Sequence, residues 1–275
     1  MPTQIERVLI LAKTYPSPSA SYVETSCVAG ITESGEMRRL YPVPFRLLAD
    51  GQQFQKWQWI DVRTEKARAD HRPESHRVFV DSIECRHRID TRGAWSERRL
   101  WLEKIPRFTS IDEVNSARET SGTSMALLTP SSIDSLEIQP ARNKDWTEAE
   151  KVKLIKNQIQ GSLFTEQDAN EDIHQLQKVP FDFYYNVTYQ TPEGPRQDKL
   201  KIIDWEAGVL YRKCVRSHGA KWQAPFRAKL EEDLFQRDLQ LLIGNQHRFQ
   251  NQWLIISLIY PPKIEGSTLL QQPLF

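Results

Sequence analysis

Several features that would narrow the function of a 275-residue chain are missing from this sequence. No apolar run approaches the ~20 residues that a membrane-spanning helix needs. The first residues carry no basic stretch ahead of their apolar run and no small-residue cleavage site, so no signal peptide is expected. Only three cysteines are present, without paired spacing, which favours a reducing compartment over a disulfide framework. These absences predict a cytoplasmic protein with no membrane partner.

The sequence does contain enough apolar material for a substantial core, with 39% hydrophobic and 10% aromatic residues. A chain of this length accommodates one large domain or two ordinary ones. The net charge of +1 conceals an uneven distribution, since residues 1–107 carry +4, residues 108–194 carry −7 and residues 195–275 carry +4. Two interpretations are open. The pattern is ordinary surface variation, or the two ends fold together into an arginine-rich surface that binds a polyanion.

Strand-like segments dominate the first hundred residues. Residues 7–14 form an apolar run that ends at a Pro-Ser turn, and residues 22–31 are rich in β-branched side chains. The prolines of "YPVP" (41–44) force an extended path that suits an edge strand. Residues 57–67 alternate between the two faces of a strand. We therefore expect residues 1–107 to form a β-rich lobe, either a barrel or a curved sheet.

The middle of the chain changes character. Residues 120–146 place Ser, Thr, Pro and Gly between short apolar pieces, which predicts a segment with little regular structure. Residues 145–160 have the apolar spacing of a helix, with Asp145 or Thr147 as its N-cap. We therefore expect residues 108–178 to form a connector that contains this one helix.

Strand and helix patterns alternate in the last third. One or two helices are expected between positions 206 and 236, and strands are expected at residues 181–190, 199–206, 238–244 and 253–260. These patterns predict an α+β lobe over residues 179–263, followed by a flexible tail over residues 264–275. The predicted fold class of the whole chain is α+β, with a β-rich N-terminal lobe, a helical connector and a second mixed lobe.

In the stretch "KTYPSPSASYVETSC" (13–27), a cysteine follows a stiff turn that is rich in proline and serine. The thiolate of Cys27 is a candidate nucleophile, with Lys13 as a cation that could activate it. Glu24 is a candidate partner, but strand alternation directs Glu24 and Cys27 to opposite faces unless the chain bends. Free cysteine is also among the most frequently buried residue types, so the alternative is a structural role in the core.

Two carboxylates lie at the end of the predicted strand at residues 199–206. Asp204 and Glu206 share a face if the strand continues, and such a pair can divide the roles of general acid and general base. The alternative is that they cap the helix that begins there, which is the commoner use of acidic residues at such a position. Both carboxylates are therefore candidate catalytic residues.

Arginine and lysine residues interleave with aromatic residues in the N-terminal lobe. Arginine binds phosphate bidentately and aromatic rings stack on bases, as a single-strand or flipped-base binder requires. A polar loop in "IGNQHRF" could in addition read a base edge. The alternative places the tryptophans in the core and pairs the arginines with nearby acids. The candidate nucleic-acid-binding residues are Arg38, Arg39, Trp57, Trp59, Arg63, Lys66, Arg72, Arg77 and His247.

A metal site has weaker support. Four residues with zinc-competent side chains lie in one segment, but their spacing matches no standard zinc finger or ribbon. We therefore expect neither a metal nor any other cofactor. The four residues are His71, His76, Cys85 and His87.

The last five residues, "QQPLF", match the Q-x-x-L-F pattern by which many bacterial replication and repair proteins resemble each other in docking to the sliding clamp. Leu274 and Phe275 would fill an apolar pocket, and Gln271 would fix the register of the peptide. The sequence therefore predicts the sliding clamp as a partner of this tail.

Six segments together resemble those of a prokaryotic family of cytosolic proteins: "KTYPSPSASYVETSC", "RRLYPVPF", "RPES", "DWEAGVLYRKC", "LLIGNQH" and "LIYPPK". The chain resembles the small protein of the bacterial 7-deazaguanine DNA-modification cluster. That resemblance implies a DNA-associated activity that converts a nitrile on a 7-deazaguanine base to the amide. It would give Cys27 a role as nucleophile, with Glu24 or Asp204 in acid–base catalysis.

Two functions follow from these observations. The first is a hydrolase- or lyase-type enzyme that modifies or processes bases in DNA. The alternative is a non-catalytic nucleic-acid-binding module of a defence or repair system, in which Cys27 is structural. A small-molecule enzyme that binds a phosphorylated substrate is a third possibility.

Overall fold

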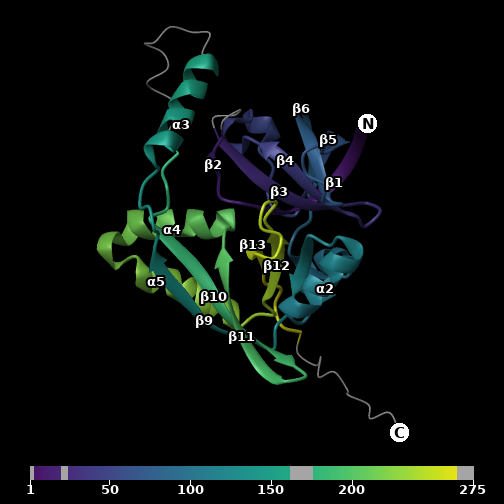
Figure 1. The fold of residues 1–275 in the computed structure, drawn as a ribbon, viewed down its shortest axis with the longest axis vertical. Coiled ribbons are helices and arrows are strands. Elements are labelled where there is room, and N and C mark those ends of the chain that lie inside the picture. Colours follow the sequence, from purple (N-terminus) through teal and green to yellow (C-terminus); the bar gives the residue numbers. More distant parts are fainter. Residues whose placement is uncertain (1–2, 20–23, 162–175, 265–275) are drawn as a thin grey trace.

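Five strands of the N-terminal part close into a barrel, and a second sheet with helices follows it (Figure 1). This computed structural model describes residues 3–19, 24–161 and 176–264. The predicted α+β class, with a β-rich first lobe and a mixed second lobe, is confirmed.

The barrel strands follow one another in the order β1-β5-β6-β4-β3, and β3 returns to pair with β1. All neighbouring pairs are antiparallel except β4 and β6, which are parallel. This closed connectivity is that of an OB-fold. A two-residue strand, β2, extends the sheet beside β3. The bounds are β1 Gln4–Lys13, β2 Ser17–Pro18, β3 Glu24–Thr32, β4 Met37–Val43, β5 Gln58–Lys66 and β6 Ser75–Arg88.

The predicted edge strand around Pro42 is instead an internal strand, because β4 lies between β3 and β6. A bulge makes this possible. Ser26 pairs with Val43 and Val28 pairs with Leu40, so β4 carries one residue more than β3 over this stretch. Proline lacks the N–H that a regular ladder position needs, and a bulge is one of the few places where an internal strand tolerates it.

The second sheet has seven strands in the order β7-β8-β12-β13-β11-β10-β9. Its strands are β7 Arg107–Phe108, β8 Met125–Leu128, β9 Ser132–Pro140, β10 Phe181–Thr191, β11 Gly194–Ile202, β12 Gln240–Asn245 and β13 Trp253–Ile259. Residues 120–146, predicted to have little regular structure, thus contribute two strands. The apolar run of β8 is only four residues long, and its place in the sheet depends on pairing with the distant β12.

In Figure 1, α4 and α5 lie beside the strands of the second sheet, whereas α3 projects away from it. Aromatic side chains of β10, such as Phe183 and Tyr185, pack against α4 and α5 in one core. The N-cap prediction for α3 is confirmed at Thr147, whose Oγ1 accepts from Glu150 N at 3.3 Å while Glu150 Oε2 accepts from Thr147 N at 2.8 Å. The bounds are α1 Arg92–Leu102, α2 Ile111–Ser121, α3 Glu148–Gly161, α4 Trp205–His218, α5 Gln223–Arg227 and a π-helical turn Ala228–Asp233.

A shared apolar core joins the barrel to the second sheet. Leu9 and Leu11, on the outer face of β1, pack in the same cluster as Leu127, Leu242 and Ile256. The interior of the barrel has its own cluster, formed by alternate residues of the same strands. Both faces of the barrel wall are therefore buried here, and the two parts of the chain are held together by packing.

Candidate functional site

A cavity of about 780 Å³ lies between the barrel and the second sheet. One wall is formed by β3, β4, the adjoining ends of β5 and β6 and the loop between them. The other wall comes from β12, β13, the loop after β12 and Ile203, which follows β11. Among its lining residues are Cys27, Arg39, Tyr41, Glu65, Arg68, Asp70, Arg72, Arg77, Ile203, Asn245, Gln246, His247, Leu254 and Ile256. The walls combine apolar side chains with cations and amides.

Cys27 faces this cavity because its neighbour Val28 points into the barrel. Its backbone is fixed by Thr14: Cys27 N donates to Thr14 Oγ1, and Thr14 N donates to Cys27 O, both at 2.9 Å. The thiol is half-buried, and its Sγ lies 3.6 Å from Nη1 of Arg39. The cavity therefore contains a nucleophilic atom next to a fixed positive charge.

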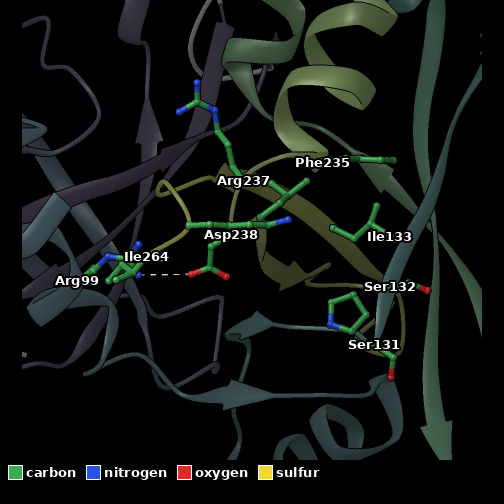
Figure 2. Close-up of a pocket in the computed structure, with 11 residues that line it drawn as sticks. Arg99, Ser131, Ser132, Ile133, Phe235, Arg237, Asp238 and Ile264 are labelled. Atoms are coloured by element: carbon green, nitrogen blue, oxygen red, sulfur yellow. Dashed lines mark hydrogen bonds and ion pairs between the residues drawn. The ribbon is translucent and has the colours of Figure 1, made fainter. Parts of the chain in front are cut away.

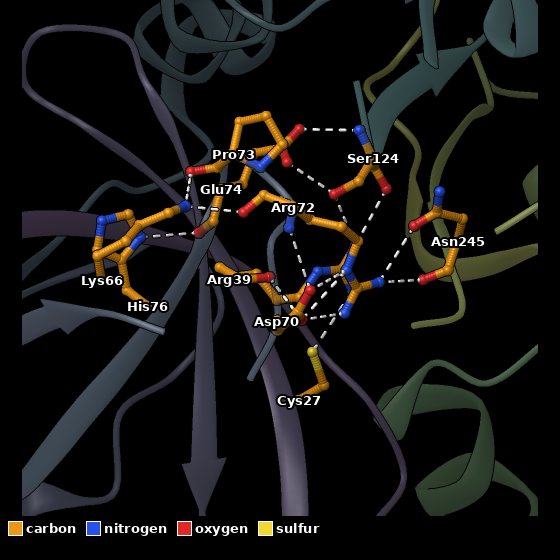
Figure 3. A network of polar contacts seen from close by, with 11 residues as sticks. Cys27, Arg39, Lys66, Asp70, Arg72, Pro73, Glu74, His76, Ser124 and Asn245 are labelled. Carbon is orange, nitrogen blue, oxygen red and sulfur yellow. Dashed lines mark hydrogen bonds and ion pairs between the residues drawn. The ribbon is translucent and has the colours of Figure 1, made fainter. Parts of the chain in front are cut away.

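Arg39 is held in the wall by contacts that cross between the two parts of the chain (Figure 3). Its side chain is buried, and Nη2 donates to the carbonyl oxygen of Ser124 at 3.0 Å. Ser124 in turn donates from Oγ to Oε2 of Glu74 at 2.7 Å. Gly244 permits this approach, since a Cβ there would lie 3.3 Å from Arg39 Nη2. The guanidinium is thus fixed in position before any ligand binds.

Arg72 forms a second cross-link a short distance away (Figure 3). Its Nη1 donates to the carbonyl oxygen of Asn245 at 2.7 Å and to Asn245 Oδ1 at 3.1 Å, and its Nε donates to Asp70. Burial disfavours the charged form of Asp70, but hydrogen bonds from Arg72 and Ser75 outweigh that effect and hold the pKa of this carboxyl well below its usual range. Arg72 therefore serves mainly to position the loops that line the cavity.

The rim of the cavity carries groups that a ligand can reach. Tyr41 is 50% exposed, and Arg68 and His247 are also exposed. Within residues 3–19, 24–161 and 176–264, no acid lies within ion-pair distance of Arg68. Arg77 pairs with Glu65 at 3.1 Å on the surface, a contact worth little in water. Sequence reasoning missed Tyr41 and Arg68, although Tyr41 stands two residues after Arg39 on the same strand.

Two predicted partners of Cys27 lie elsewhere. Lys13 pairs in register with Val28, so its side chain points to the barrel interior, where Nζ donates to Phe54 O at 3.1 Å. Burial lowers the pKa of Lys13 to about 8. Glu24 is buried and pairs with Arg46 at 3.3 Å, and burial raises the pKa of its carboxyl. Neither side chain lines the cavity that Cys27 faces.

Asp204 and Glu206 also lie outside the lining of this cavity. Asp204 is the N-cap of α4: Oδ1 accepts from Glu206 N at 2.8 Å, and Oδ2 accepts from Leu258 N at 2.9 Å. Burial raises the pKa of Asp204. Glu206 is half-exposed and pairs with Lys56 at 3.3 Å. The helix-capping interpretation therefore accounts for the contacts of Asp204.

The predicted nucleic-acid-binding residues divide into two groups. Arg39, Arg72, Arg77 and His247 line the cavity. The others do not. Trp57 and Trp59 are only 2% and 4% exposed in the core, so neither offers a ring face to a base. The three remaining cations have contacts elsewhere: Arg38 pairs with Glu6, Arg63 lies over Phe79, and Lys66 donates to Arg72 O. Trp59, on the outer face of β5, and Trp57, just before that strand, are both covered by other side chains of the shared core.

The candidate zinc ligands do not converge. In the described part of the chain, no three His, Cys, Asp or Glu side chains are placed to hold a metal ion. His76 Nδ1 bonds the carbonyl oxygen of Glu74 at 2.9 Å, and burial lowers its pKa. Cys85 lies in β6, where burial raises the pKa of its thiol, while His71 and His87 are exposed. The predicted clamp-binding residues Gln271, Leu274 and Phe275 lie outside the described residues.

A second cavity, of about 640 Å³, is lined by residues of α1, β9 and the segments after the π-helical turn and after β13. Its arginines already have partners: Arg99 Nη1 lies 3.5 Å from Asp238 Oδ2, and Arg99 Nη2 donates to Pro262 O at 2.6 Å (Figure 2). Arg237 pairs with Asp233 at 3.1 Å. Among the described residues, the lining of this second cavity contains no thiol, whereas the first contains Cys27 and lies on the barrel, so the cavity at Cys27 is the better candidate for a functional site.

Two family models match the chain and divide it after the barrel. Residues 4–104 match a domain of unknown function, DUF8758, and residues 107–275 match a second, DUF8757. The chain belongs to the DUF8757 family. In this member, the cavity is formed jointly by the DUF8757 region and the preceding barrel. No curated protein matches the sequence.

Among solved structures, one of a replication protein A heterotrimer bound to ssDNA is similar, with 9% identity and a TM-score of 0.24. The match covers 94% of this chain, which spans 65% of the length of that chain. Because this TM-score is too low to support a fold assignment, the OB-fold assignment rests on the strand order of the barrel itself. Within the described residues, no helix has the length and apolarity needed to cross a membrane.

Proposed function

We propose that this protein binds single-stranded nucleic acid across the cavity and takes one base into it. The observation that carries the proposal is the position of the cavity on β3 and β4 of the barrel. These are the second and third strands of the OB-fold, and the loop that precedes β6 is the one between its fourth and fifth strands. OB-folds bind oligonucleotides and oligosaccharides at these same elements.

The chemistry of the cavity suits a nucleotide better than a sugar. Its volume is in the range of about 300–1,000 Å³ that is typical of ligand sites. Ile203, Leu254 and Ile256 offer apolar contact to a base face, and Gln246 offers an amide to a base edge. Tyr41 at the rim can stack on a neighbouring base, since base–aromatic stacking contributes about 1–3 kcal/mol per base. Exposed arginines on the same rim can pair with phosphates.

Binding is tested by fluorescence anisotropy with labelled single-stranded DNA and RNA, using the full chain. We expect affinity to fall with salt at a log–log slope of about −0.7 per phosphate contact. Tyr41→Ala and Arg68→Ala should each weaken binding about fivefold or more. Lys221→Ala, an exposed residue outside the cavity lining, is the matched control. Failure of the wild-type protein to bind either nucleic acid at low salt would refute the proposal.

The position of Cys27 supports a second proposal, that the bound base is modified. This follows the resemblance to the 7-deazaguanine DNA-modification cluster. The Cys27 thiolate adds to the nitrile carbon, and the nitrile nitrogen takes a proton to give a thioimidate. Water then adds to that carbon, and the C–S bond breaks to return the thiolate and release the amide. One water is consumed and no oxidant or reductant is needed.

In this second proposal, two residues of the cavity assist Cys27. The Arg39 guanidinium, 3.6 Å from Sγ, favours negative charge on sulfur. His247 also lines the cavity, and its imidazole takes the acid–base role that the resemblance implied for Glu24 or Asp204. Mass spectrometry of a nitrile-bearing oligonucleotide tests the reaction. Amide formation that persists in Cys27→Ala would eliminate the nucleophile, whereas binding should be retained in that variant.

A further inference from the structure

The loop that joins β12 to β13 exposes an aromatic side chain beside the cavity. Phe249 is 58% exposed, and its neighbours Arg248 and His247 are exposed as well. His247 lines the cavity, so Phe249 lies two residues along the chain from the cavity lining. Figure 1 shows the loop at the end of the second sheet that faces the barrel. The rest of the loop is rich in amide side chains, so Phe249 does not belong to a larger apolar patch.

The loop is held in one shape by hydrogen bonds. Gln246 N donates to Gln252 O at 3.3 Å, and Gln252 N donates to Phe249 O at 2.9 Å. The buried Asn245 donates from Nδ2 to Gln250 O at 3.2 Å, and it is itself held by Arg72 of the barrel. A ring on such a loop is presented to a partner at little further conformational cost.

The same loop separates the main cavity from a neighbouring one of about 470 Å³. Gln246 and Leu254 line both cavities, so the two meet at the base of the loop. The neighbouring cavity is lined by Tyr184 of β10 and by Lys199 and Lys201 of β11. These lysines pair with surface carboxylates, at 3.4 and 2.7 Å, and such pairs are weak enough in water for a phosphate to compete.

We infer that Phe249 stacks on the nucleotide next to the one in the main cavity, and that the strand passes over this loop towards the lysines of β11. The inference rests on the proposed nucleic-acid binding and names the residue that orders the neighbouring nucleotide. A nucleotide is the occupant that fits, because its base can cover the Phe249 ring while its phosphate pairs with the exposed Arg248. A protein partner would need a wider apolar surface than a single ring on a polar loop.

The test uses eight-nucleotide single strands with 2-aminopurine placed at each position in turn. With the wild-type protein, we expect stacking to quench the fluorescence at the position that neighbours the cavity base. Phe249→Ala should abolish that quenching and weaken binding roughly five- to 150-fold. Phe249→Trp should retain both. Leu100→Ala, which truncates another exposed apolar residue, is the matched control and should change neither.

The outcomes separate this inference from the proposed function. If Phe249→Ala binds and quenches like the wild type while Tyr41→Ala and Arg68→Ala lose affinity, the stacking role is wrong and the cavity proposal stands. If the wild-type protein binds no single strand, both fall. Thermal unfolding of each variant by circular dichroism checks that it is folded, as expected for a change at an exposed loop position.

Discussion

Arg39 of the barrel donates from Nη2 to the carbonyl oxygen of Ser124, just before β8 of the second sheet, across 3.0 Å. The same guanidinium places Nη1 3.6 Å from the thiol of Cys27. One side chain therefore joins the two parts of the chain and also sets the charge at the centre of the cavity. Stability and binding should respond together when this residue is changed.

Replacing Arg39 with alanine should lower the free energy of unfolding by about 2–4 kcal/mol. The substitution removes a charge-assisted hydrogen bond to the Ser124 carbonyl oxygen, whose remaining donor is Asn245 N at 3.1 Å, and it empties the space of a buried side chain. Urea denaturation followed by tryptophan fluorescence measures the change. Arg68→Ala, which removes an exposed arginine of the same cavity, should alter stability by less than about 0.5 kcal/mol. Equal stability of the two variants would contradict the role assigned to Arg39.

Alkylation of Cys27 should be slowed by bound single-stranded DNA, because the proposed base occupies the space in front of the thiol. By mass action, an oligonucleotide at 100 times its Kd should slow the reaction about 100-fold. The rate is followed by mass spectrometry of the peptide that contains Cys27, in a Cys85→Ser, Cys214→Ser background. An unchanged rate at saturation would show that the ligand lies elsewhere. The Cys27→Ala variant should still bind the oligonucleotide, because binding does not require the thiol.

The pattern of strands was predictable from the sequence, but the surface that they form was not. An apolar run located β1, β-branched residues located β3 and alternation located β5, since each strand buries one face or both. Alternation does not show which partner covers a face. Trp57 and Trp59 were therefore ambiguous between stacking and packing until the shared core of barrel and sheet was known. Closure of the barrel likewise depends on pairing between β1 and β3 and between β1 and β5, which no local pattern specifies.

The candidate site was only partly predictable for the same reason. Arg39, Arg72 and His247 were selected by residue type, and the fold brings them to one cavity. The proposed partners of Cys27 were selected by closeness in sequence, and the register with Val28 sends Lys13 to the other side of the barrel wall. Tyr41 was overlooked because an isolated aromatic residue before a proline gives no sign of exposure. A cavity that is formed by segments far apart in sequence can be located only when the fold is known.

Asp204→Ala should destabilise the protein by about 2–4 kcal/mol and leave nucleic-acid affinity unchanged. The carboxylate caps α4 and accepts from the buried Leu258 N–H, so its removal costs a cap and leaves a donor unsatisfied. Urea denaturation and anisotropy measure the two properties. Glu206→Gln alters only a partly exposed ion pair and should cost less than about 1 kcal/mol. A loss of affinity in a folded Asp204→Ala protein would revive a role for Asp204 at the binding site.

Lys13 should make the stability of the protein rise with pH above about 8. Burial lowers the pKa of this ammonium to about 8, whereas the unfolded chain has an ordinary lysine pKa of about 10.5. Between these values the unfolded state binds more protons than the folded state, so the free energy of unfolding increases with pH, by up to about 3 kcal/mol from this residue. Below pH 8 both states are protonated, and the contribution is flat.

The pH dependence is isolated by comparison with Lys13→Met, which keeps the length of the side chain and removes the titrating group. Urea denaturation of both proteins at pH 7.5, 8.5, 9.5 and 10.5 gives the difference in free energy of unfolding at each pH. We expect the wild type to gain on the variant across this range, because only the wild type releases a proton on folding. A constant difference would mean that the Lys13 ammonium is better solvated than its contacts with Phe45 and Phe54 indicate.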